Sequence, residues 1–269
     1  MFSRVIIGIA LAIAMFIIII LRGVVLQIGM VIFGVGAAWE MCRALRGKGK
    51  RPLLWPVVLF IVLIGPANAL YGLGGILALF LASLMLALSM MVFVKDYDME
   101  SAMATLTVLF YPGGPILCFM LLNELQPESV GVVALALSVM TPVLSDCMSF
   151  FFGKVFGRHK MTDISPKKTW EGYIGGAVTT ALGVLAFGWV FHRLGYQDLT
   201  MVHYAIIGVI DAFLIPVGDL VASAIKRYAG IKDFSRILGN HGGFLDRLDS
   251  IFMSAVVVFV LMTVLRLGV

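Results

Sequence analysis

Charged residues are scarce in this sequence: Asp, Glu, Lys and Arg make up 13% of its 269 residues, where a soluble domain has about 25%. Hydrophobic residues fill the difference, at 61% of the chain, against about 45–50% in soluble domains. One globule of this size cannot bury that much apolar surface, so lipid must solvate much of it. The composition excludes an ordinary soluble enzyme and predicts a membrane protein.

Cysteine is also rare. The three cysteines, Cys42, Cys118 and Cys147, lie inside or at the edge of apolar stretches and have no ligand-like spacing. They predict neither a disulfide framework nor a zinc site, and are best interpreted as small packing residues.

A cleavage site of the A-x-A kind is absent after the first hydrophobic segment, residues 5–21. Arg4 before that segment gives it the charge pattern of a secretory signal. Hydrophobic sequence resumes directly after Arg22 and Gly23. We therefore expect the segment to stay as a first membrane span.

Nine stretches have the roughly 17–25 residues that a helix needs to cross the hydrocarbon core. The fold class predicted is an all-α polytopic membrane protein. Prolines inside the stretches do not argue against helices, because neighbouring helices can satisfy the freed backbone groups. The nine predicted spans are 4–21, 24–42, 53–71, 74–94, 102–122, 129–151, 173–191, 203–222 and 250–267.

The positions of the basic residues test this count. With the N-terminus in the cytoplasm and the C-terminus on the opposite side, 17 of the 20 Lys and Arg residues fall on the cytoplasmic side, where anionic lipid attracts them. The other three are Arg22, Arg193 and Arg266. The net charge of +5 therefore indicates anionic lipid and anionic substrates as partners, and no nucleic acid.

Two predicted cytoplasmic loops, 153–172 and 223–249, are much longer than the others, and loops of that size are usually functional. We expect residues 1–130 to form N-terminal membrane helices and residues 131–269 to form a catalytic region. Because both loops belong to the same side of the membrane, they can contribute to one site.

The second loop and the helix ends beside it contain most of the candidate catalytic and binding residues. Helical spacing places Asp219, Ser223, Lys226 and Arg227 on one face. Asp246 and Asp249 stand three residues apart and share a face if they begin the ninth helix. Carboxylates that converge from two helix ends suit Mg²⁺, which takes one or two carboxylates together with water and substrate phosphate.

A His241-Gly242-Gly243 turn precedes these carboxylates. Glycines allow close backbone approach, and N–H groups at a helix start can contact a phosphate. His241 itself is either a phosphate contact or a turn-stabilising hydrogen-bonding residue.

The pattern resembles the phosphatidate cytidylyltransferase (CDP-diacylglycerol synthase) family, whose motif runs from a Ser through Lys-Arg and Lys-Asp to His-Gly-Gly-x-x-Asp-Arg-x-Asp. The residues that match are Ser223, Lys226, Arg227, Lys232, Asp233, His241, Gly242, Gly243, Asp246, Arg247 and Asp249. A second block, with Asp146 and the Ser165-Pro-Lys-Lys-Thr169 run, is similar to the same family, although Cys147, Ser149 and Phe150 depart from its usual residues.

The resemblance implies transfer of CMP from CTP to phosphatidate, which gives CDP-diacylglycerol and pyrophosphate for phospholipid biosynthesis at a bacterial plasma membrane, with the active site facing the cytoplasm. It also implies Mg²⁺, leaves room for a second, monovalent cation, and suggests a homodimer. The roles assigned are as follows: metal binding to Asp219, Asp246, Asp249 and Asp146; catalysis to Asp219, Asp246, Lys226 and Asp249; substrate binding to Lys167, Lys168, Ser223, Arg227, His241, Gly242, Gly243 and Arg247.

Two other functions compete with this interpretation. A CDP-alcohol phosphotransferase would carry an Asp-Gly-x-x-Ala-Arg run, which this sequence lacks. A membrane ion or solute transporter could use Asp146, Asp211 and Asp219 as an ion path. The sequence shows no internal repeat, and its charges concentrate in two loops, so the enzyme is favoured.

Overall fold

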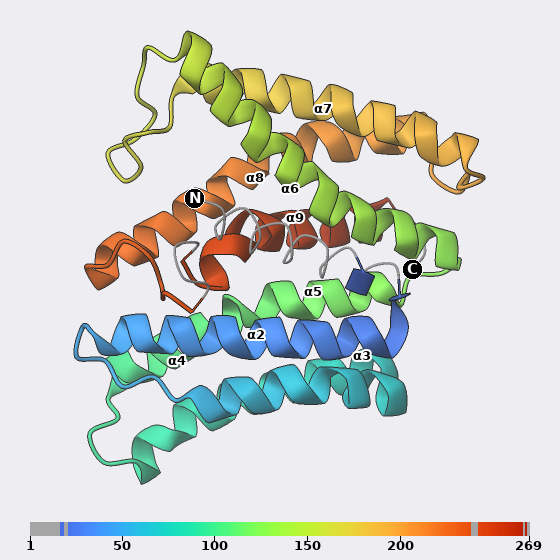
Figure 1. Ribbon diagram of the computed structural model, residues 1–269. Coiled ribbons are helices and arrows are strands. Elements are labelled where there is room, and N and C mark those ends of the chain that lie inside the picture. The colour runs from blue at the N-terminus through green and yellow to red at the C-terminus, as the bar shows by residue number, and fades with distance from the viewer. Residues whose placement is uncertain (1–16, 19–20, 238–241, 266, 268–269) are drawn as a thin grey trace. The chain divides into compact units, whose positions relative to one another are not determined.

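The computed structural model describes residues 17–18, 21–237, 242–265 and 267, and the regular elements among them are all α-helices (Figure 1). Seven helical stretches in this part of the chain are long and apolar enough to cross a membrane. The chain is therefore a helical membrane protein, as predicted. The helices are α2 (Gly23–Arg46), α3 (Leu54–Phe93), α4 (Met99–Phe110), α5 (Gly113–Asn123), α6 (Glu128–Phe156), α7 (Trp170–Arg193), α8 (Met201–Ala229) and α9 (Leu245–Val264).

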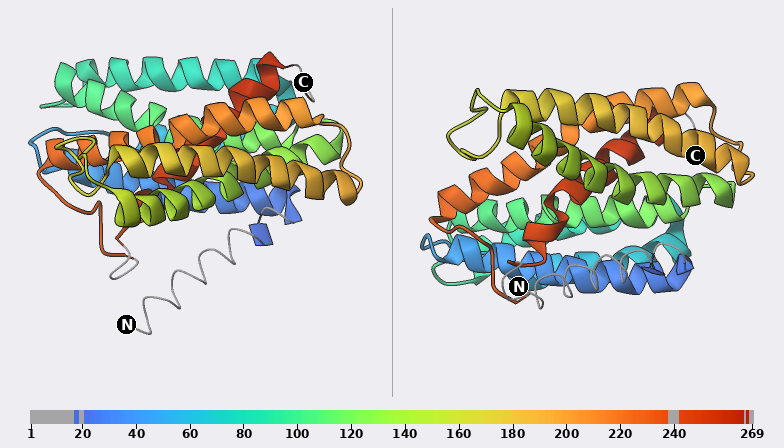
Figure 2. Two further views of the ribbon diagram at one scale, coloured as in Figure 1. Left: turned by 90° about the horizontal axis from the view of Figure 1, so that it is seen from above. Right: turned by 45° about the horizontal axis from the view of Figure 1, so that its top comes forward.

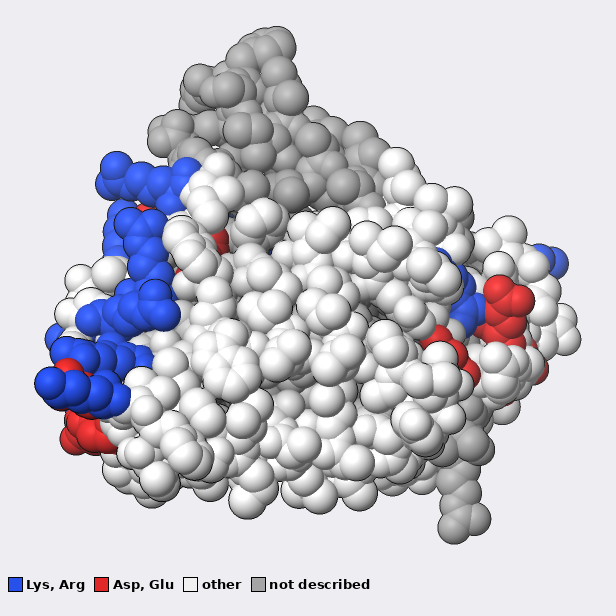
Figure 3. Space-filling view, turned by 90° about the horizontal axis from the view of Figure 1, so that it is seen from below, with Lys and Arg blue, Asp and Glu red and all other residues white. Residues whose placement is uncertain are grey.

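The surface has the distribution of charge that lipid requires. On the face drawn in Figure 3, Lys, Arg, Asp and Glu gather at two ends, and the surface between them shows none. Large apolar side chains of α3 such as Leu70, Leu77 and Val92 are exposed. Exposing these side chains to water would be unfavourable, whereas in a bilayer the lipid hydrocarbon chains cover them.

Helix α3 is two helices joined at a sharp reversal. Its 40 residues would make a straight rod of about 60 Å, twice the thickness of the hydrocarbon core. Gly72 has non-helical angles, φ 59° and ψ −149°, and the rings of Phe60 and Phe80 lie 5.7 Å apart. Residues 20 apart in a straight helix could not touch. The reversal falls between the predicted spans 53–71 and 74–94.

The predicted span 102–122 is also divided, into α4 and α5. Tyr111 leaves the helix with φ −140° and ψ 103°, and Pro112 follows it. Proline has no backbone N–H, and it disfavours helical angles in the residue before it. The two helices together, Met99–Glu124, still form one stretch long and apolar enough to cross a membrane, so the break lies inside one span, as predicted.

The count of nine spans and the orientation of the termini stay predictions. Most of the predicted span 4–21 falls outside the described residues. The long loops are shorter than expected, 157–169 and 230–244 in place of 153–172 and 223–249, because α6, α7, α8 and α9 all extend beyond their hydrophobic stretches. Hydropathy measures the segment inside lipid, and a helix continues until a turn residue ends it, as Gly230 does with φ 72°.

The chain packs as two compact units. The first unit contains residues 1–120 and 226–247, and the second contains 121–225 and 248–269. Helices α8 and α9 contribute residues to both. The predicted division into membrane and catalytic regions at residue 130 is a functional one and stays a prediction.

Within the first unit, α2 lies beside α3 and α5 (Figure 1). A Cβ added at Gly34 of α2 would lie 3.0 Å from Ile116 and 3.2 Å from Ile61, so glycine lets the three helices approach closely. The segment between α2 and α3 is anchored to α4: the backbone N–H of Leu53 donates to Thr105 Oγ1 at 3.0 Å.

Within the second unit, α6 and α7 lie side by side along much of their length (Figure 2). A Cβ at Gly172 would lie 2.7 Å from the backbone oxygen of Ser149, and one at Gly175 would lie 2.6 Å from Phe152. Small residues allow this approach, as they commonly do between membrane helices. The cluster of glycines at the start of α7 thus packs helices within one chain.

Candidate active site

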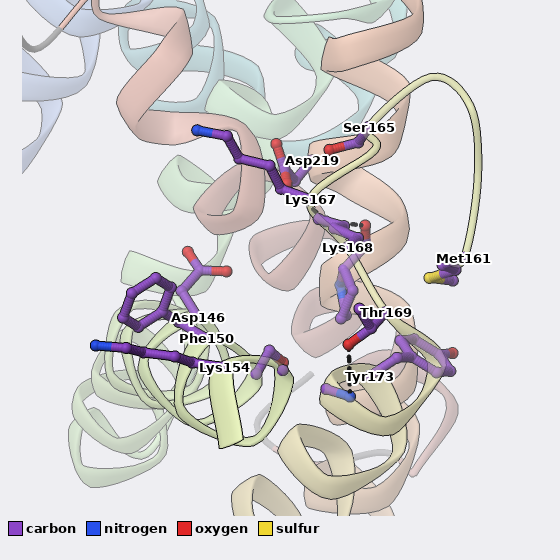
Figure 4. A pocket seen from close by; sticks show the side chains of 14 residues that line it. Asp146, Phe150, Lys154, Met161, Ser165, Lys167, Lys168, Thr169, Tyr173 and Asp219 are labelled. Atoms are coloured by element: carbon purple, nitrogen blue, oxygen red, sulfur yellow. Dashed lines mark hydrogen bonds and ion pairs between the residues drawn. The ribbon is translucent and has the colours of Figure 1, made fainter. Parts of the chain in front are cut away.

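The second unit contains a pocket of about 490 Å³, a size that suits a small-molecule ligand. Three helices and one loop form its walls (Figure 4). The lining residues are Asp146, Ser149, Phe150, Gly153 and Lys154 of α6; Met161, Ser165, Lys167, Lys168 and Thr169 of the loop; Gly172 and Tyr173 of α7; and Pro216 and Asp219 of α8.

Helix α6 presents a stripe of side chains to the pocket. Asp146, Phe150 and Lys154 recur every fourth residue, which places them on one face of the helix. Figure 4 shows the Asp146 carboxylate on the α6 side of the pocket, opposite Lys168 and Asp219. The pocket therefore has a carboxylate on each side and lysines from two elements.

The loop 157–169 is held by backbone hydrogen bonds. Met161 N–H donates to Lys168 O at 2.9 Å, and Trp170 N–H donates to His159 O at 3.0 Å. The Thr169 side chain then accepts from the Gly172 N–H at 3.2 Å and caps α7. This bonding sets the position of Lys167 and Lys168 at the pocket.

Lys168 forms an ion pair with Asp219, with Nζ 2.6 Å from Oδ2. The same ammonium group donates to Pro216 O at 3.0 Å. The two side chains are 24% and 29% exposed, so solvent screens the pair only in part. Lys167, also predicted for substrate binding, lines the same pocket and is exposed.

Asp249 is buried near the beginning of α9, where its Oδ1 accepts the Ser250 N–H at 2.8 Å. The Ser250 hydroxyl lies 3.5 Å from Asp146 Oδ1. Helix α8 passes close by, because a Cβ at Gly218 would lie 3.0 Å from the backbone oxygen of Asp249. Asp146, Asp219 and Asp249 thus lie on three packed helices of one unit.

A second cluster lies in the first unit, around Asp246. Its Oδ1 accepts from Lys226 Nζ at 2.8 Å. Its Oδ2 accepts from the backbone N–H groups of Phe234 at 2.8 Å and Gly243 at 3.0 Å. Only 7% of the Asp246 side chain is exposed. Three donors on one carboxylate give it a fixed orientation.

The Gly-Gly turn is explained by this cluster and by α2. Gly242 has φ 81°, which glycine adopts at little cost. A Cβ at Gly243 would overlap the Glu40 carboxylate. The Gly243 N–H donates to Asp246, and the expected contact of these glycines with a phosphate stays a prediction. His241 lies outside the described residues.

The remaining predicted residues are placed as follows. Helix α8 carries Asp219, Ser223, Lys226 and Arg227, so their helical spacing is confirmed. Ser223 is buried, whereas Arg227 and Arg247 are exposed. Asp219 and Asp246 belong to different units, and their convergence stays a prediction.

No three His, Cys, Asp or Glu side chains form a metal-holding group among the residues that the structure describes. The donor set still fits Mg²⁺, because that ion needs only one or two carboxylates when water and substrate phosphate complete its shell. Asp146 and Asp219, which line one pocket, offer such a pair. The metal stays a prediction.

Sequence reasoning assigned no site role to Glu40, Lys154 or Tyr173. Lys154 had a usable signal, since it falls four and eight residues after Phe150 and Asp146. Tyr173 follows the Ser-Pro-Lys-Lys-Thr run closely, and its hydroxyl donates to Phe213 O at 2.9 Å. Glu40 was an isolated acidic residue in a hydrophobic segment, and its partners lie about 200 residues away in the sequence.

Comparison with known proteins places these residues in a family. The model of a family described as "Cytidylyltransferase family" matches residues 2–265. The chain is 36% identical over 155 residues to a phosphatidate cytidylyltransferase of Staphylococcus aureus (strain COL), covering 56% of this chain and 55% of that protein.

Two further relatives come from other organisms. A phosphatidate cytidylyltransferase of Aquifex aeolicus is 31% identical over 177 residues, covering 62% of this chain and 60% of that protein. The chloroplastic phosphatidate cytidylyltransferase 4 of Arabidopsis thaliana is 39% identical over 140 residues, covering 52% of this chain and 35% of that protein. The matched part is therefore about a third to three fifths of each relative. The transporter interpretation gains no support from these matches.

Proposed function

Because the chain belongs to the cytidylyltransferase family, we propose that it transfers CMP from CTP to phosphatidate and releases CDP-diacylglycerol and pyrophosphate. The observation that carries the proposal is the pocket that brings Asp146 and Asp219 together with Lys154, Lys167 and Lys168. Anionic phosphates and a divalent cation are the ligands that such a mixture of charges suits.

The reaction needs positioning more than acid–base chemistry. A phosphate oxygen of phosphatidate attacks the α-phosphorus of CTP and forms a new P–O bond. The bond from that phosphorus to the oxygen that bridges the α- and β-phosphates breaks, and pyrophosphate leaves with the electron pair. The nucleophile is already anionic, so the protein has mainly to bring two anions together and stabilise the charge that develops.

The lysines of the pocket provide that stabilisation. Lys154 and Lys167 extend to the same side in Figure 4, and Lys168 lies against Asp219. In our proposal Lys167 and Lys168 bind phosphate oxygens, while Asp219 and Asp146 hold Mg²⁺, whose contribution is to neutralise triphosphate charge and polarise the reacting phosphate.

The Asp246 cluster serves the same reaction in this proposal. Asp246 is a further metal ligand, assisted by Asp249, and Lys226 neutralises phosphate charge. Ser223, Arg227, Arg247 and the His241-Gly242-Gly243 turn contact substrate. A second, monovalent cation, a homodimer, and an active site that faces the cytoplasm at the plasma membrane complete the proposal.

The direct test is pyrophosphate release from CTP by purified protein supplied with phosphatidate and Mg²⁺. Asp219→Asn and Asp246→Asn should each abolish turnover, because an amide is a far weaker Mg²⁺ ligand than a carboxylate. Both variants should remain folded in detergent. Asp163→Asn, an exposed aspartate of the loop 157–169 that does not line the pocket, is the matched control and should keep full activity.

Near-normal turnover in both aspartate variants would remove them from the metal site. Absence of pyrophosphate release from the unmodified protein, under conditions where phosphatidate and CTP are both present, would contradict the reaction itself.

A further inference from the structure

Glu40 is a buried acidic residue in a helix that is apolar enough to cross a membrane. It lies in α2, its side chain is 0% exposed, and neighbouring positions such as Ala37, Met41 and Cys42 are buried and apolar or nearly so. A buried carboxylate is costly unless several donors satisfy it. The presence of a carboxylate at this position therefore needs an explanation other than packing.

The donors come from the segment that carries the signature residues. Glu40 Oε1 accepts the hydroxyl of Ser235 at 2.5 Å and the N–H of Phe244 at 3.0 Å. Oε2 accepts the N–H of Leu245 at 2.9 Å. All of these residues belong to the first unit.

The bonded N–H groups lie at Leu245, where α9 begins, and at the two residues before it. A helix leaves its first N–H groups without intrahelical partners, and it favours negative charge there. Asp246 takes the Gly243 N–H, and Glu40 takes the next two along the chain, those of Phe244 and Leu245. Two carboxylates thus accept from three successive N–H groups that lead into α9.

Close packing reinforces these bonds. Gly243 has no room for a Cβ because the Glu40 carboxylate occupies that space, and Phe244 packs its ring edge against Phe33 of α2, with centroids 5.8 Å apart. A Cβ at Gly36 would lie 2.8 Å from the same Phe244 ring. The turn is held to α2 at both its backbone and its side chain.

We propose that Glu40 is a positioning residue for the cytidylyltransferase reaction: it fixes the Gly-Gly turn and the start of α9, and thereby the orientation of the Asp246 carboxylate. This inference rests on the proposed function. Glu40 touches neither substrate nor metal in the proposal. It acts through Gly243, Phe244 and Leu245, which neighbour Asp246 in sequence.

The test compares Glu40→Gln with the unmodified protein by two readouts. Gln keeps the size of the side chain but replaces one acceptor oxygen by an NH₂ group, so the N–H groups of Phe244 and Leu245, which bond to different oxygens of Glu40, can no longer both be accepted. We expect kcat to fall by about tenfold or more, since a small misplacement of a reacting group costs this much, while KM for CTP changes little. We expect amide hydrogen exchange to become about tenfold faster at Phe244 or at Leu245, whichever N–H loses its acceptor oxygen.

Cys42→Ala is the matched control. Cys42 is buried in the same helix, 1% exposed, and two residues from Glu40. Its replacement should change neither kcat nor the exchange of the Phe244 and Leu245 amides. Ser235→Ala removes one donor and leaves the carboxylate, so it should give a smaller effect of the same kind in both readouts.

A double-mutant cycle with Gly243→Ala then tests the contact itself. The added methyl group should displace the Glu40 carboxylate and lower kcat. If both residues act through one contact, combining Gly243→Ala with Glu40→Ala should cost much less than the sum of the two separate effects.

The outcomes separate the two proposals. An inactive unmodified protein overturns the reaction, and with it any catalytic role for Glu40. An active protein whose Glu40→Gln variant keeps its kcat, or keeps slow exchange at Phe244 and Leu245, overturns the positioning role alone. A Glu40→Gln variant that only loses thermal stability, with kcat per folded molecule unchanged, also overturns it.

Discussion

Lys167 and Lys168 are neighbours in sequence with different surroundings. Lys168 is engaged by Asp219 and by Pro216 O, whereas Lys167 is exposed at the pocket. Replacing Lys168 would therefore remove contacts within the protein as well as any contact with the proposed ligand. Lys167 is the better residue for testing ligand binding alone.

Lys167→Ala should raise KM for an anionic substrate about tenfold or more, because a charge-assisted hydrogen bond to phosphate contributes about 1.5–3 kcal/mol. The fold should be unaffected, since the side chain is exposed. Steady-state kinetics with CTP and phosphatidate varied in turn would show which substrate it contacts. If kcat and KM both stayed at their original values, the loop 157–169 would have no part in the site.

Asp211 is a further buried carboxylate, in the membrane-spanning part of α8. Its Oδ2 accepts from the hydroxyl of Ser254 at 2.7 Å, and both residues are 0% exposed. Oδ1 has no partner among the described residues. The pair links α8 to α9 within the second unit.

Asp211→Ala should destabilise the protein by about 1–3 kcal/mol, because the Ser254 hydroxyl would be left buried without its acceptor. Asp211→Asn keeps an acceptor oxygen and should cost less. Adding Ser254→Ala to Asp211→Ala should recover much of the loss, since no orphaned group remains. Thermal unfolding in detergent measures all three. Equal destabilisation by the Asn and Ala variants would show that the hydrogen bond contributes little.

At the scale of the helix, hydropathy located the spans well and their ends poorly. The stretches predicted from 129, 173, 203 and 250 correspond to α6, α7, α8 and α9, but these helices begin one to five residues earlier and the first three end two to seven residues later. The thickness of the hydrocarbon core sets the length of the apolar stretch. Capping residues such as Thr169 and turn residues such as Gly230 set where the helix begins and ends. Contacts between distant segments, such as Glu40 with Leu245, leave no pattern of fixed spacing in one sequence.

The reversal in α3 gives an element-scale prediction. Gly72, with φ 59° and ψ −149°, occupies a region that is open essentially to glycine alone. Gly72→Ala should therefore destabilise the hairpin by about 1–3 kcal/mol. Gly74→Ala is the matched control: a Cβ there would meet nothing within 4 Å, and alanine favours helix over glycine by about 0.5–1 kcal/mol.

Thermal unfolding of the two glycine variants in the same detergent makes the comparison. Equal stability of both would mean that α3 can pass residue 72 without the reversal.

At the scale of the whole molecule, the distribution of Lys and Arg predicts the orientation in the membrane. Nine spans with the N-terminus inside place residues 43–51 and the loop 157–169 in the cytoplasm, and residues 194–200 on the opposite side.

Single cysteines in a protein whose three native cysteines have been replaced can test it. Lys48→Cys and Asp163→Cys should resist a membrane-impermeant thiol reagent in intact cells and react in inverted vesicles. Gln197→Cys should show the opposite pattern. All three positions are exposed. Labelling of Lys48→Cys and Asp163→Cys from opposite sides would rule out the nine-span topology.

The lysine–carboxylate pairs have a thermodynamic consequence. Each of Lys168 and Lys226 already has its charge balanced by an aspartate, Asp219 and Asp246 respectively. An anion that arrives alone must compete with that aspartate, and a cation that arrives alone must compete with the lysine. If the anion and the cation bind together, the anion pairs with the lysine and the cation pairs with the aspartate, so no charge is left unbalanced. CTP and Mg²⁺ should therefore strengthen each other's binding, by the same factor in either order of addition.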